Sequence, residues 1–255
     1  LELLGLEKPS ADSTQTMSDI DFIIEDPETK MASPRIGFSI KSQLGNPATL
    51  LNASGSTNFL YKIEVPDGID IHELGLSSFG EEYDSGKIAV RKDIGTLLGA
   101  GCQLKFMGIQ NPQFQQNLEL LDSQMPQFLA NALTTYYGSK ASKISDVAEQ
   151  TFPADRPSSA QRIFKIKQFL GSIAMGLRPA TAWDGNTTKF RGILIVKIDG
   201  DVILYYLYNL LEFQDYLYSE LTFDTPSTGR HKFGSVFEQN GEYFVKLNLQ
   251  IRFIR

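Results

Sequence analysis

Two short segments near the beginning of this 255-residue chain alternate apolar and polar residues. Residues 18–24 read S-D-I-D-F-I-I, and residues 35–42 read R-I-G-F-S-I-K-S. A period of two is typical of β-strands that bury one face. The proline-containing turns between the two segments favour their pairing as a hairpin. Any fold of this chain therefore has to accommodate two adjacent strands with polar residues on one shared face.

The shared face of this predicted hairpin carries acidic and basic residues. Pairing at a strand separation of about 4.8 Å would bring Asp19 or Asp21 beside Ser39 and Lys41. Carboxylate oxygens suit Mg²⁺, and a nearby lysine can orient a water or stabilise developing negative charge. The pattern indicates metal-assisted phosphodiester hydrolysis. The competing interpretation is the ordinary polar outer face of a half-exposed hairpin.

A polar segment without acids follows the second strand. Glu64 is the first acid after Glu28, and the segment between them is rich in amide and hydroxyl side chains: Gln43, Asn46, Asn52, Ser54, Thr57 and Asn58. Amide side chains can bond base edges and phosphates. A plain polar loop explains the same composition equally well.

The rest of the chain predicts an α/β protein. Asn46-Pro47 favours a short helix over 48–53, because proline is common in a first helical turn. Helices are expected over 113–137, as one or two helices broken near Pro126, and over 158–176. Strands are expected over 59–65, 102–109, 193–198, 202–208, 233–238, 243–247 and 249–254, with hairpin turns at 199–201 and 240–241. A boundary at 152–157 divides the chain into 1–152 and 153–255, although a single domain also fits.

Composition excludes several classes of protein. Hydrophobic residues make up 42% of the chain, which is typical of a globular protein. Cys102 is the only cysteine, and two histidines cannot form a histidine-rich metal site by themselves. No apolar run approaches the roughly 18–20 residues of a membrane span, so no membrane partner and a cytoplasmic location are expected. The formal charge of −6 argues against polyanion binding by bulk charge, but it permits a nuclease with a locally basic cleft.

Four segments resemble the HpaII family of type II restriction endonucleases. They are I-G-F-S-I-K-S-Q-L-G-N-P-A-T-L-L-N-A-S-G-S-T-N-F (36–59), G-L-R-P-A-T-A-W-D-G (176–185), P-S-T-G-R-H (226–231) and K-L-N-L-Q-I-R-F (246–253). The resemblance is dense over 18–59 and 171–253. It implies the PD-(D/E)xK fold, in which helices flank a mixed central β-sheet, here with a β-rich C-terminal region. It also implies Mg²⁺-dependent cleavage of double-stranded DNA at a short palindromic G·C-rich site of the CCGG type.

The resemblance assigns catalytic roles to individual residues. Asp19 matches the first acid, Lys41 matches the motif lysine, and Asp21 is an alternative acid on the same strand face. Ser39 occupies the slot that is usually Glu or Asp, and a hydroxyl cannot supply a second carboxylate. Asp21 or Glu7 could substitute, Gln43 could contribute an oxygen, or the site could bind its cation weakly. One metal ion rather than two is expected, and the region 1–152 would be the nuclease core.

The resemblance also identifies candidate residues for reading DNA, in the region 153–255 and in the polar segment. Arginine bidentate to guanine is the commonest specific contact. The candidates are Asn52, Arg178, Thr181, Trp183, Asp184, Arg230, His231 and Arg252. Surface ion pairs compete as the explanation for each arginine, and core packing competes for Trp183.

A palindromic site predicts a homodimer with two-fold symmetry. A companion DNA methyltransferase is expected in the same restriction–modification system, without direct contact. Family members are longer at the N-terminus, so an initial segment is expected to be missing. The alternative function is a non-catalytic, sequence-specific DNA-binding module with a degenerate nuclease site. A third possibility is an α/β scaffold with unrelated ligands.

Overall fold

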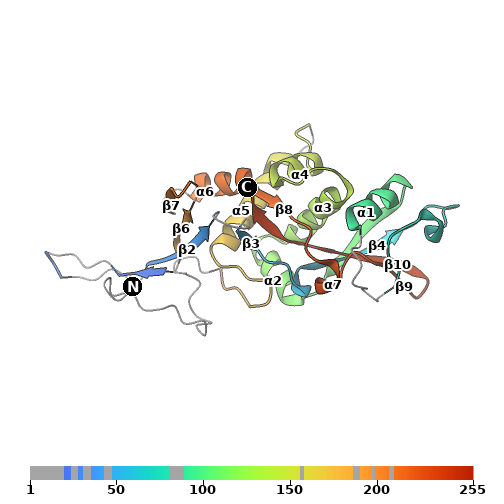
Figure 1. The fold of residues 1–255 in the computed structure, drawn as a ribbon, viewed down its shortest axis with the longest axis horizontal. Coiled ribbons are helices and arrows are strands. Elements are labelled where there is room, and N and C mark those ends of the chain that lie inside the picture. Colours follow the sequence, from blue (N-terminus) through green and yellow to red (C-terminus); the bar gives the residue numbers. More distant parts are fainter. Residues whose placement is uncertain are drawn as a thin grey trace. The chain divides into compact units, whose positions relative to one another are not determined.

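The structure is a computed structural model that describes residues 20–23, 28–30, 36–42, 48–80, 89–155, 158–185, 190–196, 199–206 and 210–254 (Figure 1). The chain forms two compact units. The small unit contains residues 1–48, 185–213 and 255, and the large unit contains residues 49–184 and 214–254. Each unit is therefore assembled from segments that are distant in sequence.

The small unit is built on a four-stranded mixed sheet with the order β1-β2-β6-β7. Its strands are β1 (Ile20–Phe22), β2 (Ile36–Ser42), β6 (Phe190–Val196) and β7 (Val202–Tyr206). β1 and β2 are antiparallel, which confirms the predicted hairpin. β2 and β6 are parallel, and β6 returns to β7 as an antiparallel hairpin. The turn of that second hairpin contains Gly200 at φ 89°, as its sequence predicts.

This division differs from the expected boundary at 152–157. The pairing of β2 with β6 joins an early segment to a late one, so a single cut in the chain cannot separate the units. A continuous division into 1–152 and 153–255 misses this, because strand pairing between distant segments leaves no local mark in the sequence. The assignment of cleavage to one region and recognition to the other stays a prediction.

The large unit contains two antiparallel sheets. One has the order β5-β4-β10-β9 and consists of β5 (Gln103–Ile109), β4 (Asn58–Glu64), β10 (Glu242–Asn248) and β9 (Val236–Gln239). The other has the order β3-β11-β8 and consists of β3 (Thr49–Leu51), β11 (Ile251–Phe253) and β8 (Leu221–Phe223). Every second residue of β4 is buried in the core, namely Phe59, Tyr61 and Ile63. This period of two is the pattern that predicts a strand here.

The connection between β9 and β10 has two residues, Asn240 and Gly241. Both have positive φ, at 54° and 78°. This is the backbone of a type I′ turn, whose twist matches the twist of the paired strands. The Asn-Gly hairpin expected from the sequence is confirmed.

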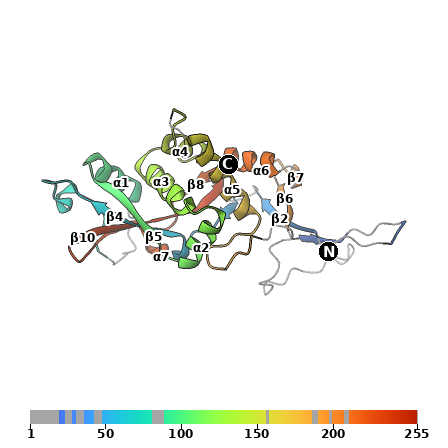
Figure 2. The ribbon, with the colours of Figure 1, turned by 180° about the vertical axis from the view of Figure 1, so that it is seen from behind.

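Helices pack around these sheets in the large unit (Figure 2). They are α1 (Val90–Gly99), α2 (Pro112–Leu121), α3 (Met125–Gly138), α4 (Ile144–Thr151), α5 (Ser159–Ala174) and α7 (Thr228–His231), with the 3-10 turns η2 (Gly55–Thr57) and η3 (Ile71–Leu74). α6 (Leu210–Glu220) reaches the large unit from Gln214 onward. α3 is central to the core: Leu129, Leu133 and Tyr137 on it are buried, and it contacts α1, α2, α4 and α5.

The predicted helical region 113–137 is two helices. α2 ends before Asp122, whose carboxylate accepts a hydrogen bond from the backbone N–H of Gln124 at 2.8 Å. Pro126 lies in the first turn of α3, where a missing N–H is harmless. Pro126 therefore marks the start of a helix and not a kink within one.

The helix expected over 48–53 is wrong. Thr49–Leu51 is a strand that pairs with β11, and Leu51 lies opposite Ile251. Burial of Leu50 and Leu51 in this sheet outweighs the weak helical signal of Asn46-Pro47. The strand expected over 233–238 begins only at Val236.

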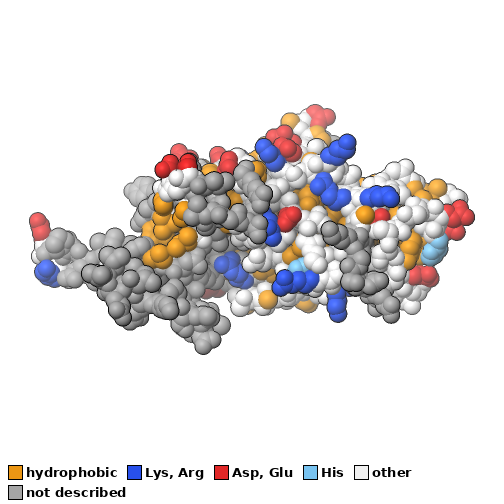
Figure 3. Space-filling model, in the orientation of Figure 1, with side chains coloured by type: hydrophobic (Ala, Val, Ile, Leu, Met, Phe, Trp, Pro, Cys, Tyr) orange, Lys and Arg blue, Asp and Glu red, His pale blue; other side chains and the backbone are white. Residues whose placement is uncertain are grey.

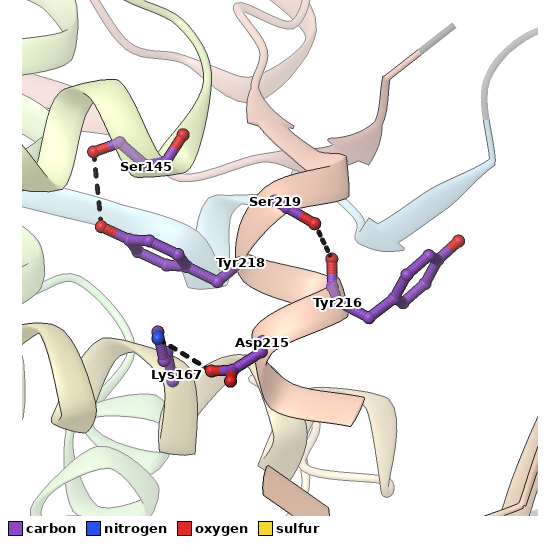
Figure 4. A network of polar contacts seen from close by, with 6 residues as sticks. All are labelled: Ser145, Lys167, Asp215, Tyr216, Tyr218 and Ser219. Carbon is purple, nitrogen blue, oxygen red and sulfur yellow. Dashed lines mark hydrogen bonds and ion pairs between the residues drawn. The ribbon is translucent and has the colours of Figure 1, made fainter. Parts of the chain in front are cut away.

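The helices α4 and α6 were not expected from the sequence. The large-unit part of α6 is held by polar contacts (Figure 4). Lys167 Nζ lies 2.8 Å from Asp215 Oδ1, and the Tyr218 hydroxyl donates to the Ser145 carbonyl at 3.4 Å. Burial and the nearby carboxylates raise the pKa of Tyr218 to about 12, so this phenol stays protonated.

No helix within the described ranges is long and apolar enough to cross a membrane.

Candidate catalytic strands and nucleic-acid interface

The register of β1 against β2 defines which positions share a face. Asp21 lies opposite Gly37, and Ile20 lies opposite Phe38. Directly paired positions share a face of the sheet, and successive positions alternate. Positions 21, 37, 39 and 41 are therefore on one face, and Phe38, on the other, is buried. The pairing of β1 with β2 therefore places positions 21 and 41, which carry Asp21 and Lys41, on the same face of the sheet.

The same register orders the positions along the ladder. Ser39 and Lys41 are two and four residues along β2 from Gly37, which corresponds to about 7 and 13 Å at the usual rise of a strand. Asp21 is thus closer to Ser39 than to Lys41. On its other edge β2 pairs with β6, with Ser39 opposite Ile193 and Lys41 opposite Ile195. Asp19, Gln43 and Glu7 lie outside the described residues.

The described part of the chain contains no group of three or more His, Cys, Asp or Glu side chains close enough to hold a metal ion. The predicted ligands at β1 are Asp19, which falls outside that part, and Asp21. The metal site therefore stays a prediction that rests on the strand register.

The candidate residues for reading DNA lie in the large unit. Asn52, Arg178, Thr181, Asp184 and Arg230 are exposed. The remaining candidates, Trp183, His231 and Arg252, are half-buried. All but Arg252 lie in three connecting segments: the loop after β3, the loop 178–184 after α5, and α7 with its flanks.

The loop 178–184 starts from a well-defined helix end. Gly176 has φ 114°, and its N–H donates to the Ile173 carbonyl at 3.0 Å. The Leu177 N–H donates to the Ser172 carbonyl at 2.9 Å, and the Leu177 side chain is fully buried. This pair of bonds with a left-handed glycine is a Schellman motif. It ends α5 abruptly and fixes the direction in which the loop leaves the helix.

Asn117, a buried residue of α2, holds the same loop from the other side. Its Nδ2 donates to the carbonyls of Arg178 and Thr181, each at 2.8 Å. Its Oδ1 accepts the Trp183 N–H at 3.1 Å. Asn117 was not among the residues expected from the sequence, although an amide among the apolar residues Phe114, Leu118 and Leu121 is a signal that could have identified it.

Two side chains of this loop have distinctive environments. The Arg178 Nη1 donates to the carbonyls of Ile173 and Leu177, each at 3.3 Å, so part of its guanidinium covers the end of α5. The indole nitrogen of Trp183 is buried and has no acceptor within the part of the chain that the structure describes. A buried N–H without a partner is unfavourable by roughly 1–3 kcal/mol.

α7 presents Arg230 and His231, and Lys232 follows with φ 52°. The Ser227 hydroxyl caps this short helix by accepting the Arg230 N–H at 3.4 Å. Figure 3 shows Lys and Arg side chains beside a histidine over the position of α7. A locally basic surface of this kind suits a phosphate or a guanine edge, despite the negative charge of the whole chain.

Two fully buried asparagines connect α7 to the loop after β3. Asn58 Nδ2 donates to the His231 carbonyl at 2.9 Å and to Gln110 Oε1 at 3.1 Å. Asn248 Nδ2 donates to Asn58 Oδ1 at 2.7 Å and to the Ser54 carbonyl at 2.8 Å. The segments that carry Asn52 and Arg230 are therefore fixed to one buried amide pair.

The His231 imidazole is less basic than a free histidine. Partial burial lowers its pKa, and the neighbouring Arg230 charge lowers it further. His231 is therefore neutral at pH 7. In that state it can accept a proton or a hydrogen bond as well as donate one.

Arg252 differs from the other candidate arginines. It lies on β11, and its Nε is 2.9 Å from Asp224 Oδ2 in a half-exposed ion pair. The surface ion pair that competes with DNA contact is thus present at this position. Its role in recognition stays untested.

Comparison with known proteins identifies the family. The family profile for the HpaII restriction endonuclease matches residues 2–253. The chain is 38% identical to the type II restriction enzyme HpaII of Haemophilus parainfluenzae over 260 aligned residues, which covers all of this chain and 69% of that enzyme. No solved structure matches the chain. The helices around mixed and antiparallel sheets are consistent with a restriction endonuclease-like fold. With this match over nearly its whole length, the chain belongs to the HpaII family of type II restriction endonucleases.

Proposed function

We propose that this enzyme cleaves double-stranded DNA at a short palindromic site of the CCGG type, and that the hydrolysis of the phosphodiester bond depends on Mg²⁺. The observation that carries the catalytic part is the β1–β2 register, in which Asp21, Ser39 and Lys41 share a face. The site sequence is proposed from the likeness to the HpaII enzyme, which extends over the whole chain.

The donor set on these strands fits a hard cation. Asp19 and Asp21 would hold Mg²⁺, which binds one or two carboxylates and keeps several waters. Ser39 in place of a second motif acid is compatible with such a hydrated ion, and Gln43 would add an oxygen. When bound, the metal polarises the scissile phosphate and lowers the pKa of a bound water. Lys41 orients the attacking water or stabilises the charge that develops on the phosphate oxygens.

The proposed reading surface is in the large unit. Arg178 and Arg230 are the arginines proposed to bond guanine, because both are exposed on segments that buried amides hold in place. Thr181, Trp183, Asp184, Asn52 and His231 would contact neighbouring base edges or phosphates. Arg252 would act mainly through its pair with Asp224.

A palindromic site supports a homodimer, since each copy would read one half-site. A companion methyltransferase would protect the same sequence as a separate protein. Sedimentation of the enzyme with a cognate duplex measures the stoichiometry. Two chains per duplex support the dimer, and one chain per duplex contradicts it.

The proposed function is tested by mapping cleavage on a fully sequenced plasmid. With Mg²⁺, the ends of all fragments are expected at CCGG-type palindromes, and EDTA is expected to abolish cleavage. Asp19→Ala and Lys41→Ala are expected to bind DNA without cutting it. Ends scattered over unrelated sequences, or cleavage in EDTA, contradict the proposal.

A further inference from the structure

Every hydrogen-bonding group of the Asn117 side-chain amide has a partner. This side chain is only 2% exposed. Besides the three bonds to the loop 178–183, its Oδ1 accepts Gln113 Nε2 at 3.0 Å. Both donor hydrogens and both acceptor sites of the amide are thus used. The amide cannot be reversed, because its oxygen would then face the carbonyl oxygens of Arg178 and Thr181.

Asn117 supplies bonds that the loop does not make for itself. Residues 178–185 form no helix or strand, yet three backbone groups between 178 and 183 bond to this one side chain. The Schellman motif fixes where the loop begins, and Asn117 fixes its next six residues. Arg178, Thr181 and Trp183 therefore leave the backbone in directions that depend on a residue of another helix.

We propose that Asn117 is a positioning residue for sequence discrimination: its amide sets the conformation of the loop 178–183 and so orients the side chains that read DNA. The proposal rests on the proposed function, since it assumes that this loop contacts the recognition site. Asn117 itself is buried and touches no DNA. Its effect passes through the backbone of residues 178, 181 and 183.

Asn117→Asp is the sharpest variant. The carboxylate keeps the acceptors for the Trp183 N–H and for Gln113, but it removes both donors and faces two carbonyl oxygens with a negative charge. Asn131→Asp is the matched control. Asn131 lies on the neighbouring helix α3 and also accepts from a glutamine four residues earlier, Gln127 at 2.8 Å, but it is exposed and holds no loop.

Trp183 is the only tryptophan, so intrinsic fluorescence reports on this loop directly. In Asn117→Asp, the emission of Trp183 is expected to shift to longer wavelength and acrylamide is expected to quench it more strongly. Asn131→Asp is expected to match the wild type in both measurements. An unchanged Trp183 emission and quenching in a folded Asn117→Asp protein overturns the proposal.

The second readout is discrimination. The ratio of kcat/KM for a CCGG duplex to that for a duplex with one altered base pair is expected to fall about tenfold or more in Asn117→Asp, the size of one lost base contact. A preserved ratio alongside altered fluorescence also overturns the proposal. If the wild type shows no preferred site, the proposed function fails at that step, and the fluorescence still decides whether Asn117 holds the loop.

Asn117→Ser is the second variant in case the carboxylate prevents folding. Its smaller side chain leaves room for water to bond the freed carbonyls. Circular dichroism of each variant confirms that the protein compared is folded. The same two readouts apply, with the same outcomes for and against the proposal.

Discussion

At the scale of single residues, the basic surface on α7 contains a histidine that is harder to protonate than usual. Partial burial and the adjacent Arg230 both lower the pKa of His231. The folded protein therefore binds a proton at this site less readily than the unfolded chain does. The free energy of unfolding decreases with falling pH wherever the unfolded state binds more protons than the folded state.

The expected result is a pH-dependent difference between the wild type and His231→Gln. As the pH falls below about 6.5, the ordinary pKa of histidine, the wild type should lose free energy of unfolding relative to the variant. Urea unfolding at a series of pH values measures this difference. In the background of Arg230→Gln the difference should shrink but persist, because burial is the larger cause. A wild type that gains stability relative to His231→Gln on acidification contradicts this assignment.

Trp183 offers a second test at this scale. Its buried indole N–H has no acceptor among the described residues, and removal of such an orphan donor relieves about 1–3 kcal/mol. This gain offsets the smaller ring of phenylalanine, so Trp183→Phe should leave the free energy of unfolding unchanged to within about 1 kcal/mol. Thermal unfolding followed by circular dichroism measures it. A loss of several kcal/mol would mean that the indole nitrogen has a partner.

At the scale of elements, connecting segments are held together by buried amides. Asn58 and Asn248 connect η2, the start of β4, the end of β10 and α7. Asn117 connects α2 with the loop after α5. Leaving a buried hydrogen-bonding group without a partner is costly, so each of these amides holds together the segments to which it bonds.

A comparison of Asn58 with Asn52 tests whether the buried amides stabilise the protein. Asn58→Ala leaves the His231 carbonyl and one of the two Asn248 Nδ2 hydrogens without a partner, and it should lower the free energy of unfolding by about 2–4 kcal/mol. Asn52→Ala changes an exposed side chain and should stay within about 0.5 kcal/mol of the wild type. Denaturant unfolding compares them. Equal stability of the two variants contradicts the supporting role of Asn58.

The elements that were predictable from the sequence are those whose signal is local. The β1–β2 hairpin, β4, α5 and the Asn240-Gly241 turn follow from periodicity or turn chemistry. The structure of residues 48–53 could not be predicted correctly, because this strand forms by pairing with β11, which is about 200 residues away in the sequence. The residue propensities of the segment itself carry no information about that pairing.

In the candidate site, too, only features with a local signal in the sequence could be predicted. Exposed residues such as Arg178 and Arg230 could be selected by type and by family resemblance. The buried amides that hold them could not, since their partners are backbone groups distant in sequence. The ion pair of Arg252 with Asp224 is likewise a tertiary contact that no local pattern contains.

At the scale of the whole molecule, a formal charge of −6 limits how DNA can bind. Bulk attraction is absent, so affinity has to come from local cations such as those around α7. Each phosphate that a cation neutralises contributes about 0.9 to the slope of log affinity against log salt. Substitution of a residue that reads a base instead lowers the preference for the cognate sequence over other sequences.

We propose that the β1–β2 strands of the small unit cleave DNA and that the loops and α7 of the large unit read its sequence. The most direct test compares Lys41→Ala with Arg230→Ala, for binding and for cleavage of a CCGG duplex and of a duplex with one altered base pair. Lys41→Ala should lose cleavage and keep its preference for the CCGG duplex in binding. Arg230→Ala should lose that preference, by about 1–3 kcal/mol, and still cleave in Mg²⁺. If Lys41→Ala cleaves at the wild-type rate, or if Arg230→Ala weakens binding to both duplexes equally, this division of roles is wrong.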